Sequence, residues 1–327
     1  MRRWVRMVLA SMGELAVSVV LVTAICFFLM TVGLGDPMAA LYGERLTAVS
    51  SEEAQSLRQI YGLDKPIVMQ YFMWLMSLLQ GDLGVSYWEG RPVLDMLAER
   101  LGATLVLTVP ALVLGYGLAV MLGTWMAERA GSAGDRLAHT GLFALWSMPT
   151  FLSGLVLLSV FGVWLEVLPI GGIAPLGETF DIRHSLPYLA LPLTVLTVHT
   201  AARLTGIVRS AVADELASDY IRSARALGLG ERTIRRYALR SSLFTLITTA
   251  SFQLPKLFAG AVMTEMIFAW PGIGRLLLSA AYQRDYPLIL GAVVCISILT
   301  VASSLLADLV CRMLDPRIRR RREGENR

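Results

Sequence analysis

Long stretches without charged residues constrain this chain more than any other feature. Leu101–Ala127, Leu137–Leu165 and Tyr286–Ala307 contain no Asp, Glu, Lys or Arg. About 20 consecutive apolar residues suffice for a helix to cross the hydrocarbon core of a bilayer. The composition agrees, because 55% of the 327 residues are hydrophobic and 17% are charged, whereas a soluble domain carries about 25% charged residues. We therefore predict an all-α integral membrane protein.

Three further apolar segments, Leu15–Gly35, Ser185–Ala202 and Ser241–Ala269, complete a set of six predicted transmembrane helices. The first one follows a basic N-terminus, as a signal peptide does. However, it is longer than the roughly 7–15 apolar residues of a signal peptide and lacks an Ala-x-Ala ending. We interpret it as a retained first span.

The distribution of arginine predicts the orientation. Of the 29 basic residues, 20 lie in the N-terminus, in segments 128–138 and 203–240, and in the tail from Arg312, which six spans would place on one side. Loops rich in Lys and Arg face the cytoplasm. The prediction is a cytoplasmic N-terminus (1–14), a first span (15–35), an external segment (36–100), a membrane core (101–314) that includes cytoplasmic segment 203–240, and a basic cytoplasmic tail (315–327).

The external segment contains one short helix signal and a second, apolar piece. Ser50 followed by Glu53 forms a capping box, and Gly62 marks a stop, which predicts a short helix between them. The uncharged piece Val68–Leu79 is too short to span a bilayer. It is expected to lie in the interface, to pack as a lid, or to be a structured loop without a specific role.

Segment 203–240 shows helical periodicity outside the predicted spans. Through Asp214–Leu229 an apolar stripe recurs at helical spacing, formed by Leu216, Tyr220, Ala224 and Leu227. Gly228 and Gly230 are typical of a helix end. A second amphipathic piece, Glu231–Leu239, leads into the fifth span. Two short helices of this kind could rest on anionic headgroups or dock a partner.

Enzyme motifs are missing from the sequence. The two lysines, Lys65 and Lys256, do not stand in a Gly-Lys-Ser/Thr context, so the chain has no P-loop for ATP. The three histidines lie in separate segments, and the three cysteines have unrelated spacings. Neither a catalytic constellation nor a metal site is predicted.

Polar residues inside the fifth span suggest a translocation path. Gln253, Lys256 and Glu265 interrupt an otherwise apolar segment. Ionisable groups within spans are costly and tend to face cavities. These three residues either line a path through the membrane or are held by partner helices, and the first interpretation is favoured.

The sequence DYIRSARALG at Asp219–Gly228 resembles the membrane subunit of bacterial ABC importers for dipeptides, oligopeptides and nickel. The resemblance covers nearly the whole chain through ordered motifs: Gly35-Asp36-Pro37, Tyr61-Gly62-Leu63-Asp64, Gln70-Tyr71, Trp74-Leu75, Gly81-Asp82-Leu83-Gly84, Leu168-Pro169, Phe268-Ala269-Trp270-Pro271-Gly272-Ile273-Gly274, Arg284-Asp285-Tyr286-Pro287 and Asp315-Pro316-Arg317. Each motif alone is weak, but the ordered set is specific.

The resemblance implies a type I ABC importer permease of the bacterial inner membrane, with no ATP site or cofactor of its own. In this family a cytoplasmic coupling helix inserts into a cleft on the ATPase subunit. The matching residues are Tyr220, Ala224, Arg225, Ala226 and Gly228. The implied partners are a second permease, two ATP-binding subunits, an extracytoplasmic solute-binding protein and the lipid bilayer, with no nucleic acid.

Two other classes of protein stay open at this point. An ion-coupled secondary transporter would use Glu265 or His199 as its proton site, and a membrane anchor or scaffold would need no transport chemistry. Within the importer family, the sequence favours peptides over nickel chelates as substrate without deciding between them.

Overall fold

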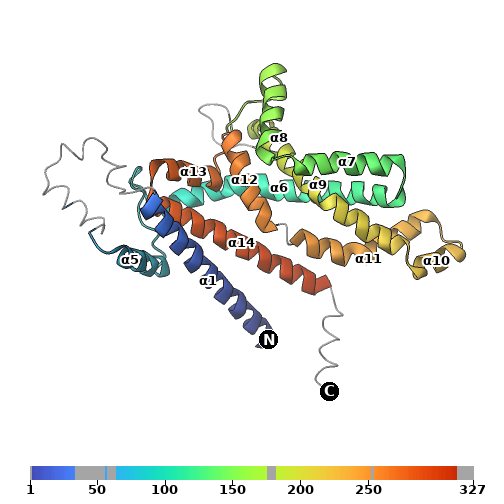
Figure 1. The fold of residues 1–327 in the computed structure, drawn as a ribbon, viewed down its shortest axis with the longest axis horizontal. Helices are drawn as coiled ribbons and strands as arrows, with labels where there is room; N and C mark the ends of the chain where they lie inside the picture. Colours follow the sequence, from blue (N-terminus) through green and yellow to red (C-terminus); the bar gives the residue numbers. More distant parts are fainter. Residues whose placement is uncertain (1, 34–55, 57–63, 175–181, 252–253, 315–327) are drawn as a thin grey trace. The chain divides into compact units, whose positions relative to one another are not determined.

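The computed structural model describes residues 2–33, 56, 64–174, 182–251 and 254–314, and these are predominantly helical (Figure 1). The all-α prediction is confirmed, since the β-structure among these residues is one isolated bridge between Val85 and Pro92. The helices are α1 (Arg2–Gly33), α5 (Ile67–Leu79), α6 (Val93–Glu128), α7 (Ala133–Ser147), α8 (Thr150–Leu157), the π-helix η1 (Leu158–Trp164), α9 (Ile182–Leu216), α10 (Asp219–Ala226), α11 (Glu231–Ser251), α12 (Leu254–Ile267), α13 (Ile273–Gln283) and α14 (Tyr286–Leu314).

Three of the described helices, within α6, α9 and α14, are long and apolar enough to cross a membrane, and the bent α7–α8–η1 pair would make a fourth. The described apolar part of α1, Ala16–Thr31, is shorter. The predicted fifth span is divided between α11 and α12, with 252–253 outside the described residues. The count of six spans therefore remains a prediction.

The chain forms two compact units. The first comprises residues 1–104 and 271–301, and the second comprises residues 105–270 and 302–327. Helices α6 and α14 each contribute to both units. The predicted helix signals at Ser50, Glu53 and Gly62 lie outside the described residues, as does the tail 315–327.

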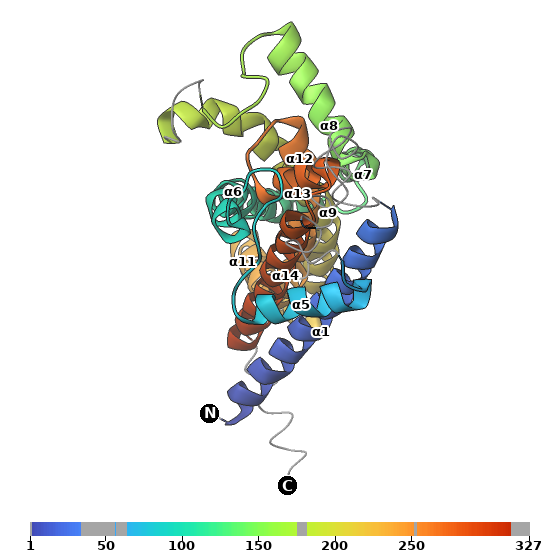
Figure 2. The same ribbon diagram turned by 90° about the vertical axis from the view of Figure 1, so that its left-hand side faces the viewer.

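In the first unit, the short apolar helix α5 packs against α1 (Figure 2). Tyr71 is 7% exposed and makes the contact. Its hydroxyl donates to the carbonyl of Val20 at 2.9 Å and lies 3.1 Å from the hydroxyl of Thr23, while its ring lies 5.6 Å from that of Phe27. The apolar piece Val68–Leu79 thus forms a helix, α5, whose Tyr71 packs against α1, and its role at the interface or as a lid stays a prediction.

Asp285 organises the turn between α13 and α14. The residue is fully buried, and its carboxylate accepts hydrogen bonds from the Ser86 hydroxyl at 2.5 Å and from the Leu288 amide at 3.3 Å. The preceding Arg284 ends α13 in the left-handed region, with φ of 58°. The hydroxyl of the following Tyr286 donates to the Met30 carbonyl at 3.1 Å. This sequence motif therefore stabilises the first unit.

Helix α9 lies at the centre of the second unit, where it contacts α7, α8, α11 and α12. Its approach to α6 depends on a glycine. A Cβ atom at Gly123 would lie 2.7 Å from the Val208 side chain and 2.9 Å from the carbonyl oxygen of Thr205. Small residues of this kind let helices pack closely where the hydrophobic effect gives little driving force between them.

The junction between α6 and α7 is fixed by a buried ion pair. Asp135, with 3% of its side chain exposed, accepts hydrogen bonds from Nε and Nη2 of Arg209 in α9, each at 2.6 Å. The Asp135 carboxylate also accepts from the Gly131 amide at 2.9 Å, and the Ser132 hydroxyl accepts from the Asp135 amide at 3.2 Å. Together these contacts cap α7 and attach it to α9.

The predicted span Leu137–Leu165 contains a bend of 99° between α7 and the helical stretch formed by α8 and η1. Met148 adopts an extended conformation with ψ of 130°, and Pro149 precedes the first residue of α8. Proline disfavours helical geometry in the residue before it. The apolar composition of this segment hid the break.

Candidate functional site

The predicted coupling helix corresponds to α10, at the tip of the hairpin that α9 and α11 form (Figure 1). The predicted single helix over Asp214–Leu229 is wrong, because α9 ends at Leu216 and α10 begins at Asp219. Ser218 adopts an extended conformation there, and its hydroxyl donates to the Glu215 carbonyl at 2.5 Å. The break turns α10 away from the axis of α9. We name residues 217–230 the α10 segment.

Isoleucine anchors the α10 segment. Ile221 in α10 and Ile234 in α11 are both fully buried, as is Ala238 one turn beyond Ile234. Helices α10 and α11 are in contact, so this apolar seam holds the short helix in place. Ile221 is not part of the apolar stripe predicted from the sequence, which consists of Leu216, Tyr220, Ala224 and Leu227. The spacing of four residues between Ile234 and Ala238 was the available signal for the buried face.

The predicted stripe instead supplies much of the exposed surface. Leu227 is 80% exposed and Tyr220 is 45% exposed, while Ala226 is exposed and Ala224 is half-buried. Single exposed apolar residues are common on protein surfaces. Here they lie among exposed charged side chains of the same short helix, including Asp219 and Arg222.

Tyr220 is oriented by a hydrogen bond to the end of α9. Its hydroxyl donates to Oε2 of Glu215 at 2.6 Å. Desolvation raises the pKa of the Tyr220 phenol, and the hydrogen bond to Glu215 raises it further. The phenol is therefore neutral near pH 7, and the hydrogen bond fixes the orientation of its ring on α10.

The C-terminal end of the α10 segment is set by Gly228. This residue has φ of +80°, a conformation that non-glycine residues rarely adopt, and it follows the C-cap Leu227. Arg225 in α10 forms an ion pair with Glu231 at the start of α11, with Nε 3.0 Å from Oε1. The predicted helix stop at Gly228 and the second amphipathic helix from Glu231 are both observed.

The predicted translocation-path residues are only partly described. Glu265 lies in α12 and is fully buried. Lys256 belongs to the same helix, and Gln253 lies outside the described residues. His199, the alternative proton site, is 2.8 Å from the Ser153 hydroxyl through Nε2. The structure does not test a path role for these residues, which stays a prediction.

The described helices have the fold of the membrane-embedded subunit of a type I ABC importer. The fold matches an inward-facing structure of the MetNI methionine ABC transporter with a TM-score of 0.54, covering 68% of this chain and 97% of that chain at 18% identity. The fold expected from the resemblance is thereby confirmed.

The family follows from the sequence profiles. The profile described as "Binding-protein-dependent transport system inner membrane component" matches residues 119–320, and the profile of the N-terminal part of such membrane components matches residues 4–108. The chain belongs to this family.

Similar proteins match over most of their length. The chain is 35% identical to the oligopeptide transport system permease protein AppB of Bacillus subtilis (strain 168) over 300 residues, which cover 91% of this chain and 94% of that protein. It is 31% identical to the dipeptide transport system permease protein DppB of Escherichia coli (strain K12) over 337 residues, covering 96% and 99%. The resemblance stated from the motifs is confirmed.

Proposed function

We propose that this chain is the permease subunit of an ATP-driven, binding-protein-dependent importer that moves di- or oligopeptides inward by alternating access. Support for the peptide class comes from the names of the two relatives, an oligopeptide and a dipeptide permease. Nickel chelates are the alternative substrate suggested by the motif resemblance, and no observation in the structure favours them.

The observation that carries the proposal is the construction of the α10 segment. A buried isoleucine, Ile221, fixes the helix, while Leu227 and Tyr220 present apolar surface outward. A partner that grips this surface can transmit its movement through α9 and α11, because α10 lies between them in the chain. ATP binding in the partner would thus reorient the membrane helices without an ATP site in this chain.

The proposed assembly contains a second permease, two ATP-binding subunits and an extracytoplasmic solute-binding protein. In this arrangement the chain lies in the bacterial inner membrane with both termini in the cytoplasm. The distribution of arginine supports this orientation, because 20 of the 29 basic residues fall in the predicted cytoplasmic segments. The acidic external segment 36–100 would face the solute-binding protein.

The docking assignment is tested with a matched pair of alanines. Ala226 lies in the α10 segment, and Ala130 lies in the turn between α6 and α7; both are exposed. Ala226→Arg adds a bulky charge to the proposed docking surface, whereas Ala130→Arg adds the same charge to the other junction. In proteoliposomes containing the complete transporter, uptake of a labelled peptide and co-purification of the ATP-binding subunit are measured for both variants.

We expect Ala226→Arg to abolish both peptide uptake and co-purification, while Ala130→Arg retains both. If Ala226→Arg retains normal uptake and subunit association, the docking assignment is wrong. The substrate class is tested separately with the unmodified transporter, by comparing ATP-dependent uptake of labelled dipeptide with uptake of labelled nickel. Uptake driven by a proton gradient without ATP would overturn the ATP-driven mechanism.

A further inference from the structure

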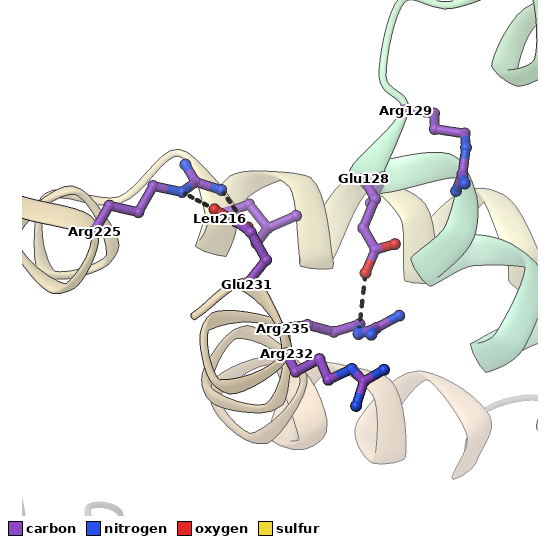
Figure 3. A pocket seen from close by; sticks show the side chains of 8 residues that line it. Glu128, Arg129, Leu216, Arg225, Glu231, Arg232 and Arg235 are labelled. Carbon is purple, nitrogen blue, oxygen red and sulfur yellow. Dashed lines mark hydrogen bonds and ion pairs between the residues drawn. The ribbon is translucent and has the colours of Figure 1, made fainter. Parts of the chain in front are cut away.

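Four arginines converge on one pocket of the second unit (Figure 3). The pocket has a volume of about 500 Å³ and lies where the end of α6, the end of α9, α10 and the start of α11 come together. Its lining residues are Ala127, Glu128, Arg129, Leu216, Arg225, Glu231, Arg232 and Arg235. Of the predicted coupling residues, Arg225 lines this pocket, whereas Tyr220, Ala224, Ala226 and Gly228 do not.

The charges in the pocket are unbalanced. Arg225 pairs with Glu231 at 3.0 Å, and Arg235 pairs with Glu128 at 3.2 Å. Arg232 and Arg129 have no acidic partner among the residues that the structure describes. The lining therefore carries two uncompensated positive charges at neutral pH, since arginine stays protonated.

The spacing along α11 adds to this imbalance. Arg232 and Arg235 are three residues apart, so their side chains leave the same face of the helix, and both are seen to extend toward the pocket in Figure 3. Like charges at this spacing repel each other by a few tenths of a kcal/mol. An anion held between them would relieve the repulsion and accept hydrogen bonds from both guanidinium groups.

We propose that this pocket binds a phosphate group. The planar guanidinium fork matches phosphate oxygens in a bidentate geometry, and several arginines around one pocket provide such forks from different directions. The site also borders the end of an apolar helix, where the Arg129 guanidinium lies 5.1 Å from the centre of the Trp125 ring. Tryptophan is enriched at the membrane interface, which is the depth of phospholipid headgroups.

Two sources of phosphate share this chemistry, a phospholipid headgroup and a soluble phosphate. To separate them, the full-length chain is reconstituted in phosphatidylcholine nanodiscs, which carry no net lipid charge. One arm titrates in phosphatidylglycerol and follows bound lipid by native mass spectrometry. The other adds inorganic phosphate against chloride at equal ionic strength and follows the thermal unfolding midpoint. No partner subunit or ATP is present, so the result does not depend on the proposed transport function.

The informative variant is Arg232→Gln, and Arg236→Gln is its matched control. Both residues are exposed on α11, but Arg236 does not line the pocket. Losing one charge-assisted bidentate contact is expected to weaken phosphate binding about tenfold, whereas the control should stay within about twofold. Arg129→Gln, which removes a pocket charge from outside α11, should also weaken binding.

Selective loss of phosphatidylglycerol binding in Arg232→Gln supports a headgroup site, and a selective loss of the inorganic phosphate response supports a soluble phosphate. Equal weakening in Arg232→Gln and Arg236→Gln would show nonspecific surface attraction and overturn the proposal. Absence of either response in the unmodified chain would overturn it too. Unchanged phosphate binding in Arg232→Gln would overturn it as well, because this arginine would then make no contact with the bound phosphate.

Discussion

The two polar junctions of the second unit are built in opposite ways. Between α6 and α7, Asp135 is 3% exposed and forms two 2.6 Å hydrogen bonds with Arg209. Between α9 and α11, the ion pair of Arg225 with Glu231 leaves 45% and 74% of the two side chains exposed. The first junction is held by a buried carboxylate, whereas the charged groups of the second are exposed to solvent.

The two junctions therefore differ in how much stability the chain loses when the ion pair is broken. Breaking a buried ion pair leaves an uncompensated charge and costs roughly 3–5 kcal/mol, whereas an exposed pair contributes about 0–1 kcal/mol. The α10 segment depends on Ile221 for its position and leaves its other surface available for a partner. The comparison therefore assigns stability to the first junction and supports the proposed docking role of the second.

The largest effect, and the strongest test of the difference between the two junctions, is expected for Asp135→Ala. This change strands Arg209, and we expect the free energy of unfolding to fall by about 3 kcal/mol, the low end for a buried pair, because 27% of the arginine side chain stays exposed. Denaturation of the purified chain in detergent micelles, followed by circular dichroism, measures the change. The control is Asp214→Ala, at an exposed position of α9, with an expected loss below about 0.5 kcal/mol. Equal losses in Asp135→Ala and Asp214→Ala would show that the buried ion pair contributes no more stability than an exposed charge.

The next largest effect is expected where α6 approaches α9. Gly123→Ala places a Cβ 2.7 Å from Val208 and 2.9 Å from a backbone oxygen of α9, so the helices must move apart at a cost of about 2 kcal/mol. Gly117→Ala serves as the control in the same helix, because nothing lies within 4 Å of its added Cβ. A chain that tolerates both changes equally in thermal unfolding would show that the close approach is not required.

The class of structure could be predicted from the sequence because the absence of charge over about 20 or more residues indicates a membrane helix whatever the local contacts are. Uncharged runs such as Leu101–Ala127 indicated membrane helices, and Gly228 indicated a helix end. Local periodicity, in contrast, could not distinguish the face that a helix buries from the one it exposes. For α10 it selected the stripe with Tyr220 and Leu227, and burial instead falls on Ile221.

Other features depend on contacts between residues far apart in the chain. Asp135 and Arg209 are 74 positions apart, and Ser86 and Asp285 are 199 positions apart. No local pattern predicts which charge meets which partner. The 99° bend after α7 was signalled only by Pro149, which an apolar segment can also tolerate within a span.

A smaller effect is expected at the end of α10. Gly228 has φ of +80° and open space around it, so Gly228→Ala introduces backbone strain without a clash. We expect a loss of about 1 kcal/mol. Gly230→Ala is the matched control two residues later, since that glycine also has open space and no positive φ. Thermal unfolding midpoints of the two variants would be compared, and a Gly230→Ala midpoint as low as that of Gly228→Ala would argue against strain as the cause.

The smallest effect is expected for Glu231→Gln, which removes the exposed partner of Arg225. The change also deletes an acidic residue from the first turn of α11, where a negative charge interacts favourably with the helix dipole. Both contributions are screened by solvent, so the total loss should be about 0.5 kcal/mol.

Unfolding measured at low and high salt separates this case from Asp135→Ala, because salt screens exposed charges more strongly than buried ones. The difference between Glu231→Gln and the unmodified chain should vanish at about 1 M salt, while that of Asp135→Ala persists. A Glu231→Gln loss that exceeds about 2 kcal/mol and resists salt would mean that the α10 segment is held by its charges, and the contrast between the two junctions would fail.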